Sequence, residues 1–348
     1  MNRVDELSGH PAIVGEKNDN GRSTVDSVLP FERPFVDLEA RIELSDSEEE
    51  RQGLALELEH QRQVVFPNLS AWERVQLARH AMRPRMLDYV KRVFDDVLEL
   101  HGDRALGDDP AMITGIARFH GRTVMIAGQQ KGVSTEEKVE RNFGMAHPEG
   151  YRKARRMYSL AERFGLPTIT FVDTPAAHPG IEAEQHGQGP AIAQSILHGL
   201  QLRTPIYTAV LGEGGSGGAL AIAVSDWTAM FEHAIYVICP PERCAEILWR
   251  DVEKKELAAA ALRSTAADLK RFNVIDEVLP EPGGGAHRNP DGAAQVLIES
   301  IDRFLDGCVK GRWTPEKRQR KFQRMGVWRE QQLAVASPQL ANAADQRG

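Results

Sequence analysis

Short apolar runs rich in β-branched residues alternate with longer stretches of helical character through the middle of the chain, and this alternation limits the fold more than any other feature. Three of the runs have the composition of buried strands: 168–174, 205–212 and 234–240. Helices are expected around them, at 149–164, 187–203 and 217–226. Two more strands are expected at 111–119 and 123–130, on either side of a His-Gly-Arg turn. Because this order produces parallel strands joined by crossover helices, the sequence predicts an α/β fold.

Segments of different composition flank this α/β body, which is expected at 69–310. Residues 1–30 are polar and lack periodicity, which predicts a disordered leader. Residues 31–68 are charge-rich with scattered leucines, which predicts an N-terminal helical arm, either solvated or docked on a partner or on the body. Residues 311–348 turn basic and then polar, which predicts a partly disordered surface tail.

The start of the body, residues 69–100, is expected to form two helices, because Pro84 would break or kink a single one. Ser70 and Glu73 have the spacing of a capping box at the start of the first helix. In the second, apolar residues recur at helical spacing: Leu87, Val90, Phe94, Val97 and Leu98.

The overall composition excludes several classes of protein. The 348 residues include 43 Lys or Arg and 50 Asp or Glu, and the net charge of −7 argues against a nucleic-acid binder that relies on overall positive charge. The 3 cysteines form no CxxC pair, so neither a metal site nor a disulfide framework is expected. The chain has no secretory signal and no apolar run of the ~18 residues that span a bilayer. We therefore expect a cytoplasmic protein without a membrane or nucleic-acid partner.

The stretch Leu211–Val224 is the most informative motif, with five glycines in seven residues between a strand and an apolar helix. It matches the GxGxxG dinucleotide fingerprint, but no acidic residue ends the next strand and the motif lies far from the first βαβ unit. A phosphate-binding P-loop is not indicated either, because no Lys-Ser/Thr follows the glycines. An oxyanion hole remains, in which free main-chain N–H groups at the helix start stabilise developing negative charge. Close helix–strand packing is the simpler alternative, and it is expected to account for one or two of the glycines.

A second candidate region, Asp173–Gln188, follows a strand at the edge where open α/β sheets bind ligands. His178 and His186 could form a metal pair or supply a general base, but lone loop histidines more often only form hydrogen bonds. A third region, Gly128–Met157, is locally basic and contains Lys131; it would suit a coenzyme A or carrier-protein surface, or simply be a solvated helix face. Convincing side-chain acids and bases are scarce, which favours chemistry performed by main-chain dipoles.

Five motifs, in order, resemble one known family: GQQKG, RNFGM-x-HPEGYRKA, AERFGLP-x-ITF-x-DTP, GEGGSGGALAI and EPGGGAHRNP. The chain is similar, from about residue 32 to about 306, to the carboxyltransferase alpha subunits of bacterial acetyl-CoA carboxylase. The resemblance implies a crotonase-like fold, a β-β-α spiral superhelix, over 69–310. It also implies transfer of a carboxyl group from carboxybiotin, on a biotin carboxyl carrier protein, to acetyl-CoA, which gives malonyl-CoA for fatty acid biosynthesis. An α2β2 heterotetramer with a zinc-ribbon beta subunit is implied, with ATP consumed by a separate biotin carboxylase.

The resemblance further implies that the main-chain amides of Gly217, Gly218 and Ala219 hold the ureido oxygen of biotin. The implied substrate-binding residues are Gly214, Gly215, Pro175, Ala176, Ala177, His178, His186 and Lys131. The family usually reads DTPGAYPG and AEERGQ, whereas this chain has Ala176 and His178 in the first motif and Gln185 and His186 in the second. These departures raise the hypothesis of a divergent copy that acts on another acyl-CoA, or serves as an inhibitor-insensitive or regulatory subunit.

Overall fold

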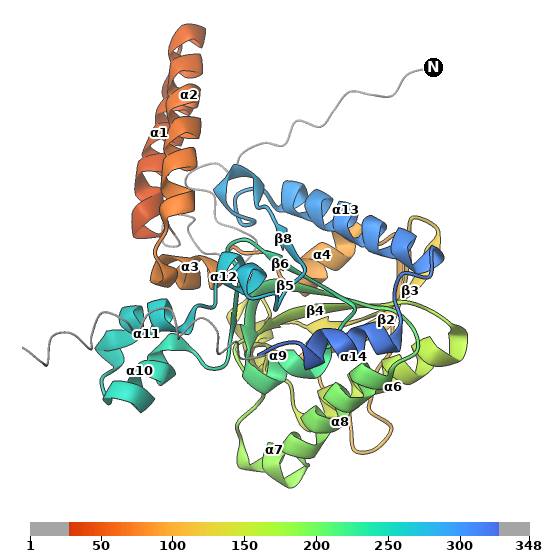
Figure 1. The fold of residues 1–348 in the computed structure, drawn as a ribbon. Helices are drawn as coiled ribbons and strands as arrows, with labels where there is room; N and C mark the ends of the chain where they lie inside the picture. The colour runs from red at the N-terminus through yellow and green to blue at the C-terminus, as the bar shows by residue number, and fades with distance from the viewer. Residues whose placement is uncertain (1–27, 327–348) are drawn as a thin grey trace, which may run out of the picture.

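The computed structural model of the chain describes residues 28–326, and a mixed sheet lies at its centre (Figure 1). The strands are β1 (Asp96–Glu99), β2 (Met112–Phe119), β3 (Arg122–Gln129), β4 (Thr168–Thr174), β5 (Ile206–Gly215), β6 (Trp227–Phe231), β7 (Ile235–Val237) and β8 (Glu277–Leu279). They lie in the order β1-β2-β3-β4-β5-β6-β8, with β7 paired to β5. Strand β2 runs antiparallel to both of its neighbours, β1 and β3. The other strand pairs, from β3 to β8, are parallel. The predicted α/β class is confirmed.

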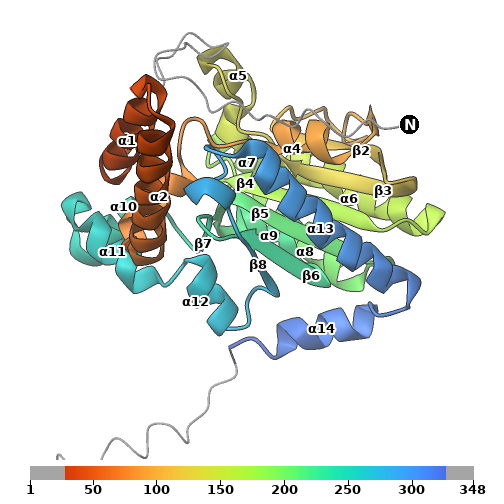
Figure 2. The same ribbon diagram turned by 90° about the horizontal axis from the view of Figure 1, so that it is seen from above.

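Helices cover both faces of the sheet. On one face lie α4 (Met86–Val93) and α13 (Pro290–Val309), and on the other α6 (Pro148–Phe164), α8 (Gln188–Gln201) and α9 (Ser216–Ala223) (Figures 1 and 2). All seven residues of β4 and all ten of β5 are consequently buried. The three predicted crossover helices are confirmed within three residues at each end. The strand predicted at 234–240 is shorter than expected, and β5 extends three residues beyond its predicted end.

The far half of β5 leaves the main path of the sheet. Its residues Tyr207–Val210 pair with β6, whereas Glu213–Gly215 pair with β7. The register between β4 and β5 also shifts, between Val172 and Thr174. A bulge of this kind redirects a strand and commonly lies beside an active site. The glycine-rich end of β5 is thereby turned away from β6.

Two long helices, α1 (Arg33–Leu44) and α2 (Glu48–Val65), pack side by side and project from the body as an arm (Figure 1). The helical character predicted within 31–68 is therefore present. The arm has its own small core around Phe35, Leu54 and Leu58. Glu32 anchors the arm to the body, because its carboxylate lies 2.7 Å from His287 Nε2 and 3.3 Å from Arg288 Nε. This contact shows where the start of the arm docks.

The predicted helix break and capping box are confirmed in the next segment. Ser70 caps α3 (Ala71–Ala78), and the Glu73 side chain accepts a hydrogen bond from the Ser70 amide at 2.7 Å. The prediction that the second helix continues to Leu98 was wrong. Val97 and Leu98 lie in edge strand β1 and are 43% and 64% exposed. Their spacing imitates a helix, but pairing with β2 determines the backbone there.

The remaining elements of the described range are short. They are α5 (Thr135–Glu140), η4 (Asn142–Gly144), α7 (Ile181–Gln185), α10 (Pro241–Trp249), η5 (Val252–Lys254), α11 (Lys255–Leu262), α12 (Ala266–Arg271) and α14 (Pro315–Gln323), together with η2 (Pro30–Glu32), η3 (Phe66–Asn68) and η6 (Pro282–Gly284). Helix α14 lies in the predicted tail yet packs against α8. The predicted disorder of the leader and of the end of the tail concerns residues outside the described range. Within 28–326 no helix combines the length and apolarity needed to cross a bilayer.

Candidate active site

The bend between β5 and α9 is a strained connection without any loop. Strand β5 ends at Gly215 and α9 begins at Ser216, whose φ is +51°. A left-handed conformation at a residue other than glycine costs about 1–3 kcal/mol, and such strain clusters at functional sites. It turns the chain at once from strand to helix, so the first turn of α9 lies directly at the strand end.

Two main-chain amides at this bend, those of Gly217 and Gly218, lie at the start of α9, where a helix leaves its N–H groups without an intrahelical acceptor. The amide of Ala219 follows in the same turn, and the residue four positions before it is Gly215, the N-cap, whose carbonyl is the usual acceptor of the first intrahelical bond. No loop carbonyl among residues 28–326 accepts a hydrogen bond from the Gly217 or Gly218 amide. Gly217 is half-buried, and Ser216 and Leu220 on either side of the bend are exposed. Gly218 and Ala219 are buried, so Gly217 is the partly accessible one of the three residues at the positive end of the helix dipole.

Close packing accounts for more of the glycines than expected. A Cβ would come within 2.9 Å of Asp173 Oδ1 at Gly212, within 2.7 Å of Tyr236 at Gly214, and within 2.5 Å of the Ala177 nitrogen at Gly218. At Gly215 it would collide with the Pro175 carbonyl. The expectation that packing explains only one or two glycines was wrong, because it explains four of the five. At Gly217 a Cβ would instead find only Ile192 within 4 Å, at 3.6 and 3.8 Å.

The loop that follows β4 lies against this bend, which brings Pro175, Ala176 and Ala177 beside Gly215 and Gly218 as expected. Thr174 closes the loop, because its hydroxyl donates to the Ala176 carbonyl at 2.6 Å and accepts from the Ala176 amide at 3.3 Å. Ala176 is not among the residues with positive φ. Its Cβ is therefore tolerated where the family usually has glycine.

The two histidines of this region have separate partners, so they do not form a pair. His178 Nδ1 lies 2.8 Å from Asn142 Nδ2, and its ring stacks on that of His147 with centroids 4.3 Å apart. Burial and the neighbouring His147 lower the pKa of His178. His186 Nδ1 instead lies 3.0 Å from a Glu149 oxygen, in α6. That either histidine binds substrate stays a prediction.

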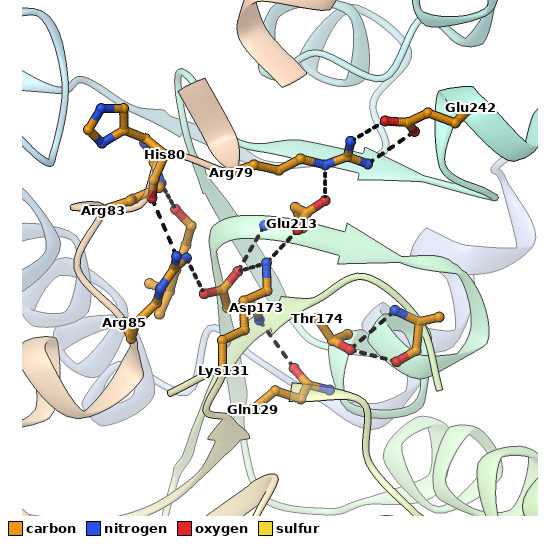
Figure 3. A network of polar contacts seen from close by, with 12 residues as sticks. Arg79, His80, Arg83, Arg85, Gln129, Lys131, Asp173, Thr174, Glu213 and Glu242 are labelled. Atoms are coloured by element: carbon orange, nitrogen blue, oxygen red, sulfur yellow. Dashed lines mark hydrogen bonds and ion pairs between the residues drawn. The ribbon is translucent and has the colours of Figure 1, made fainter. Parts of the chain in front are cut away.

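Lys131 belongs to a buried network of charges below the bend (Figure 3). Its ammonium lies 2.5 Å from Glu213 Oε2 and 2.9 Å from Asp173 Oδ1. Arg79 binds the other oxygen of Glu213 at 2.6 Å and also contacts Glu242. Burial would raise the pKa of Glu213, but Lys131 and Arg79 outweigh it and lower that pKa to about 2. Lys131 thus has its charge neutralised inside the protein, and a contact with substrate stays a prediction.

The same network links the sheet to the bend. Asp173 accepts a hydrogen bond from the Glu213 amide at 3.1 Å and lies 3.4 Å from Arg85 Nη1. Gln129 accepts from the Asp173 amide at 3.2 Å and donates to the Gly218 carbonyl at 3.0 Å. The positions of β4, β5 and α9 are therefore tied together by side chains. Sequence analysis missed these roles, although Gln129, Asp173 and Glu213 all stand within the quoted motifs.

One cluster in the described part of the chain has metal-ligand character: Glu32, His80 and His287, whose candidate ligand atoms all lie within 4.8 Å of one another. The guanidinium of Arg288 already lies on the same Glu32 oxygen as His287. A cation there would have to displace it, so the cluster is best explained as the anchor of the arm. A cavity of about 370 Å³ lies between arm and body, lined in part by Arg62, Arg74 and His233, and it contains none of the predicted site residues.

Solved structures place the fold in one class of protein. The chain superposes on transcarboxylase 12S with a TM-score of 0.52 and 19% identity, covering 64% of this chain and 42% of that chain. The superposition on the beta subunit of geranyl-CoA carboxylase from P. aeruginosa has a TM-score of 0.52 and 17% identity, and it covers 71% of this chain and 46% of that chain. This chain thus spans less than half the length of these two proteins. The fold is that of the crotonase-like carboxyltransferases, as expected.

Sequence relatives narrow the class to a family. The family model described as acetyl co-enzyme A carboxylase carboxyltransferase-like matches residues 28–326. The acetyl-coenzyme A carboxylase carboxyl transferase subunit alpha of Cyanothece sp. is 49% identical over 316 residues, covering 86% of this chain and 96% of the relative. The subunit of the same name from Thermus thermophilus is 47% identical over 315 residues, which cover 87% of this chain and 99% of the relative. The chain belongs to the family of acetyl-CoA carboxylase carboxyltransferase alpha subunits.

Proposed function

We propose that this chain is the alpha half of a carboxyltransferase that moves a carboxyl group from carboxybiotin to acetyl-CoA, giving malonyl-CoA for fatty acid biosynthesis. The observation that carries the proposal is the first turn of α9, in which Gly217 and Gly218 present amides without an intrahelical acceptor and Ala219 follows. Preorganised main-chain donors of this kind stabilise negative charge on an oxygen, and removing one such donor costs about 10²–10³ in rate.

The three amides would hold the ureido oxygen of biotin. When bound, carboxybiotin supplies the carboxyl group and a ring nitrogen that leaves more readily as its ureido oxygen is stabilised. The chain's own contribution is the fixed direction of the N–H groups, maintained by the 174–177 loop and by the hydrogen bond from Gln129 to the Gly218 carbonyl. Beside Gly217 a Cβ would contact only the Ile192 side chain, at 3.6 and 3.8 Å, and no main-chain atom, which fits an approach of ligand to this turn.

The proposed partners follow from the position of the bend. Gly217 is half-buried and Ser216 beside it is exposed, so a second protein would have to close the site there. A carboxyltransferase beta subunit in an α2β2 heterotetramer would supply that wall. Biotin would arrive on a biotin carboxyl carrier protein, and a separate biotin carboxylase would use ATP to load it. We propose that this assembly works in the cytoplasm, without a metal ion in this chain and without membrane or nucleic acid.

The test uses the full chain co-expressed with its beta subunit, carboxylated carrier protein and acetyl-CoA, with malonyl-CoA as the measured product. Gly217→Val fills the space beside the amides, and we expect a loss of about 10²-fold in kcat. Gly189→Ala in α8 is a matched control, because nothing lies within 4 Å of a Cβ there. Equal activity of Gly217→Val and the wild type would contradict the role of the amides.

A second candidate function rests on the substitutions at 176, 178 and 186. These change the loop beside the amides, so the complex could prefer another acyl-CoA or serve as an inhibitor-insensitive or regulatory subunit. Propionyl-CoA and longer acyl-CoA substrates, assayed beside acetyl-CoA, separate the possibilities. A preference for acetyl-CoA would exclude the acyl-CoA variant of this hypothesis, and transfer at an ordinary rate would exclude a silent regulatory subunit.

A further inference from the structure

The side chain of His178 connects the loop after β4, which packs closely on α9, to the strained η4 turn. Its main chain is already held independently, because its amide donates to the Ala146 carbonyl at 3.1 Å and its carbonyl accepts from Gln188 Nε2 at 2.9 Å. The ring adds a contact to Asn142, in η4. The loop containing His178 also carries Ala176 and Ala177, which pack on Gly218. The ring is thus a link from this loop to η4.

The η4 turn is strained through three consecutive residues. Asn142, Phe143 and Gly144 have φ values of +44°, +55° and +78°. A left-handed conformation is unfavourable for a bulky residue such as Phe143, which is nevertheless 48% exposed. A Cβ at Gly144 would lie 3.0 Å from the Asp173 carbonyl and 2.8 Å from Lys131 Cγ, so the turn rests on the end of β4. Strain of this kind persists only where the surroundings enforce it.

The hydrogen bonds of Asn142 fix which state of His178 makes the link. Asn142 Nδ2 lies 2.8 Å from the Met145 carbonyl oxygen, which can only accept, so this end of the amide is the NH₂ donor. His178 Nδ1 must therefore be the acceptor, and the ring must be neutral with its proton on Nε2. A proton on Nδ1 would place two donors face to face. It would also add charge beside His147.

We propose that neutral His178 is a positioning residue for carboxyl transfer: by accepting the Asn142 hydrogen bond it holds the Asn142–Gly144 turn, with Phe143, against the loop that packs on Gly218. Protonation of His178 releases this link and lowers the rate of transfer on the acid side of neutrality. The inference rests on the proposed function and adds to it a residue type that the family usually lacks at this position. The charged groups acting on the ring are His147, at the start of α6, and Glu182, in α7; the carboxylate of Glu182 opposes the effect of His147.

Four variants in the complex with the beta subunit test the link. His178→Ala is expected to lower kcat/KM for carboxylated carrier about tenfold at pH 8, with the KM for acetyl-CoA unchanged. His178→Asn keeps an acceptor near the position of Nδ1 but cannot titrate, so it should recover most of that loss and remove the acid-side fall in rate. Asn142→Asp replaces the NH₂ donor by a carboxylate, which bonds only a protonated Nδ1, so it should break the link with neutral His178 and make the rate rise, not fall, as the pH drops below neutrality. His60→Asn, on the exposed face of the arm, is the control.

A measurement without catalysis separates this inference from the proposed function. The imidazole NMR signals of His178 in the full chain should show the Nε2–H tautomer and a pKa below 6.5. An Nδ1–H tautomer, or an acid-side fall in rate that persists in His178→Asn, overturns the inference while transfer itself is intact. Absence of transfer in the wild-type complex overturns the proposed function, and with it the catalytic part of the inference, even where the NMR signals agree.

Discussion

A Cβ at Gly218 would lie 2.5 Å from the main-chain nitrogen of Ala177, so helix α9 and the loop after β4 meet backbone to backbone. Such a contact cannot be relieved by a change of rotamer. Gly217, one residue earlier, has no main-chain atom of another segment within 4 Å of its own Cβ position. The two neighbouring glycines therefore differ: a Cβ at 218 would collide with main chain, whereas one at 217 would only make ordinary contact with the Ile192 side chain.

This difference predicts opposite effects of alanine at the two positions. Gly218→Ala should lower the free energy of unfolding by about 1–3 kcal/mol, as overpacking does, and reduce transfer because the amides move. Gly217→Ala should leave the free energy of unfolding within about 1 kcal/mol of the wild type, because helix propensity favours alanine and the space is available. Urea denaturation of both variants checks the prediction, and equal destabilisation would contradict it.

The pair Arg83–Glu281 gives a second prediction, because both side chains are completely buried. The guanidinium forms two bonds to the carboxylate, at 2.6 and 2.9 Å, and a third to the Leu211 carbonyl at 2.8 Å. Arg83→Met would leave Glu281 as an unpaired buried charge and should cost about 3–5 kcal/mol of stability.

A surface pair provides the comparison for Arg83→Met. Arg243 and Glu246 are also in contact, but their side chains are 65% and 51% exposed. Arg243→Ala should change the free energy of unfolding by less than about 1 kcal/mol. Chemical denaturation of both variants measures the difference, and a loss below about 1 kcal/mol for Arg83→Met would show that the buried pair contributes little.

The depressed pKa of Glu213 predicts a dependence of stability on pH. Burial alone would raise this pKa, but Lys131 and Arg79 hold it at about 2, below the ordinary glutamate value of 4.5. The folded state therefore binds a proton less readily than the unfolded state, and the stabilisation is complete above pH 4.5 and lost as the pH falls towards 2. The full effect is about 3 kcal/mol for this group. Glu213→Gln should be less stable at pH 7 and show a shallower loss of stability between pH 4.5 and 2, as measured by denaturation at each pH.

Sequence reasoning succeeded where one periodicity dominates. Strand β4 is buried along its whole length, and its short run of β-branched and aromatic residues is typical of a buried strand. It failed at Val97 and Leu98, where two exposed residues have helical spacing but lie in an edge strand determined by its partner β2. Local patterns contain no information about such long-range pairing.

The candidate site shows the same division. The glycine-rich bend was visible because five glycines at a strand–helix junction need a physical reason. The network from Arg79 to Asp173 was not, because it joins side chains from four separate segments that only the folded chain brings together. The role of Asn142 was hidden for a similar reason, since its partner His178 is 36 residues away.

Helix α14 gives the last prediction, because a basic segment expected to be solvated contains a fully buried arginine. Arg318 donates to the carbonyls of Gly199, Leu202 and Thr204 and binds Asp226 at 2.5 Å. These carbonyls lie in the last turn of α8 and just beyond it, so Arg318 satisfies acceptors that the helix leaves free. Arg318→Ala should lower the free energy of unfolding by about 3–5 kcal/mol, because Asp226 would remain buried without its partner. Arg320→Ala, an exposed neighbour in the same helix, should have little effect. Denaturation curves with equal midpoints for the two variants would show that α14 is only a surface attachment.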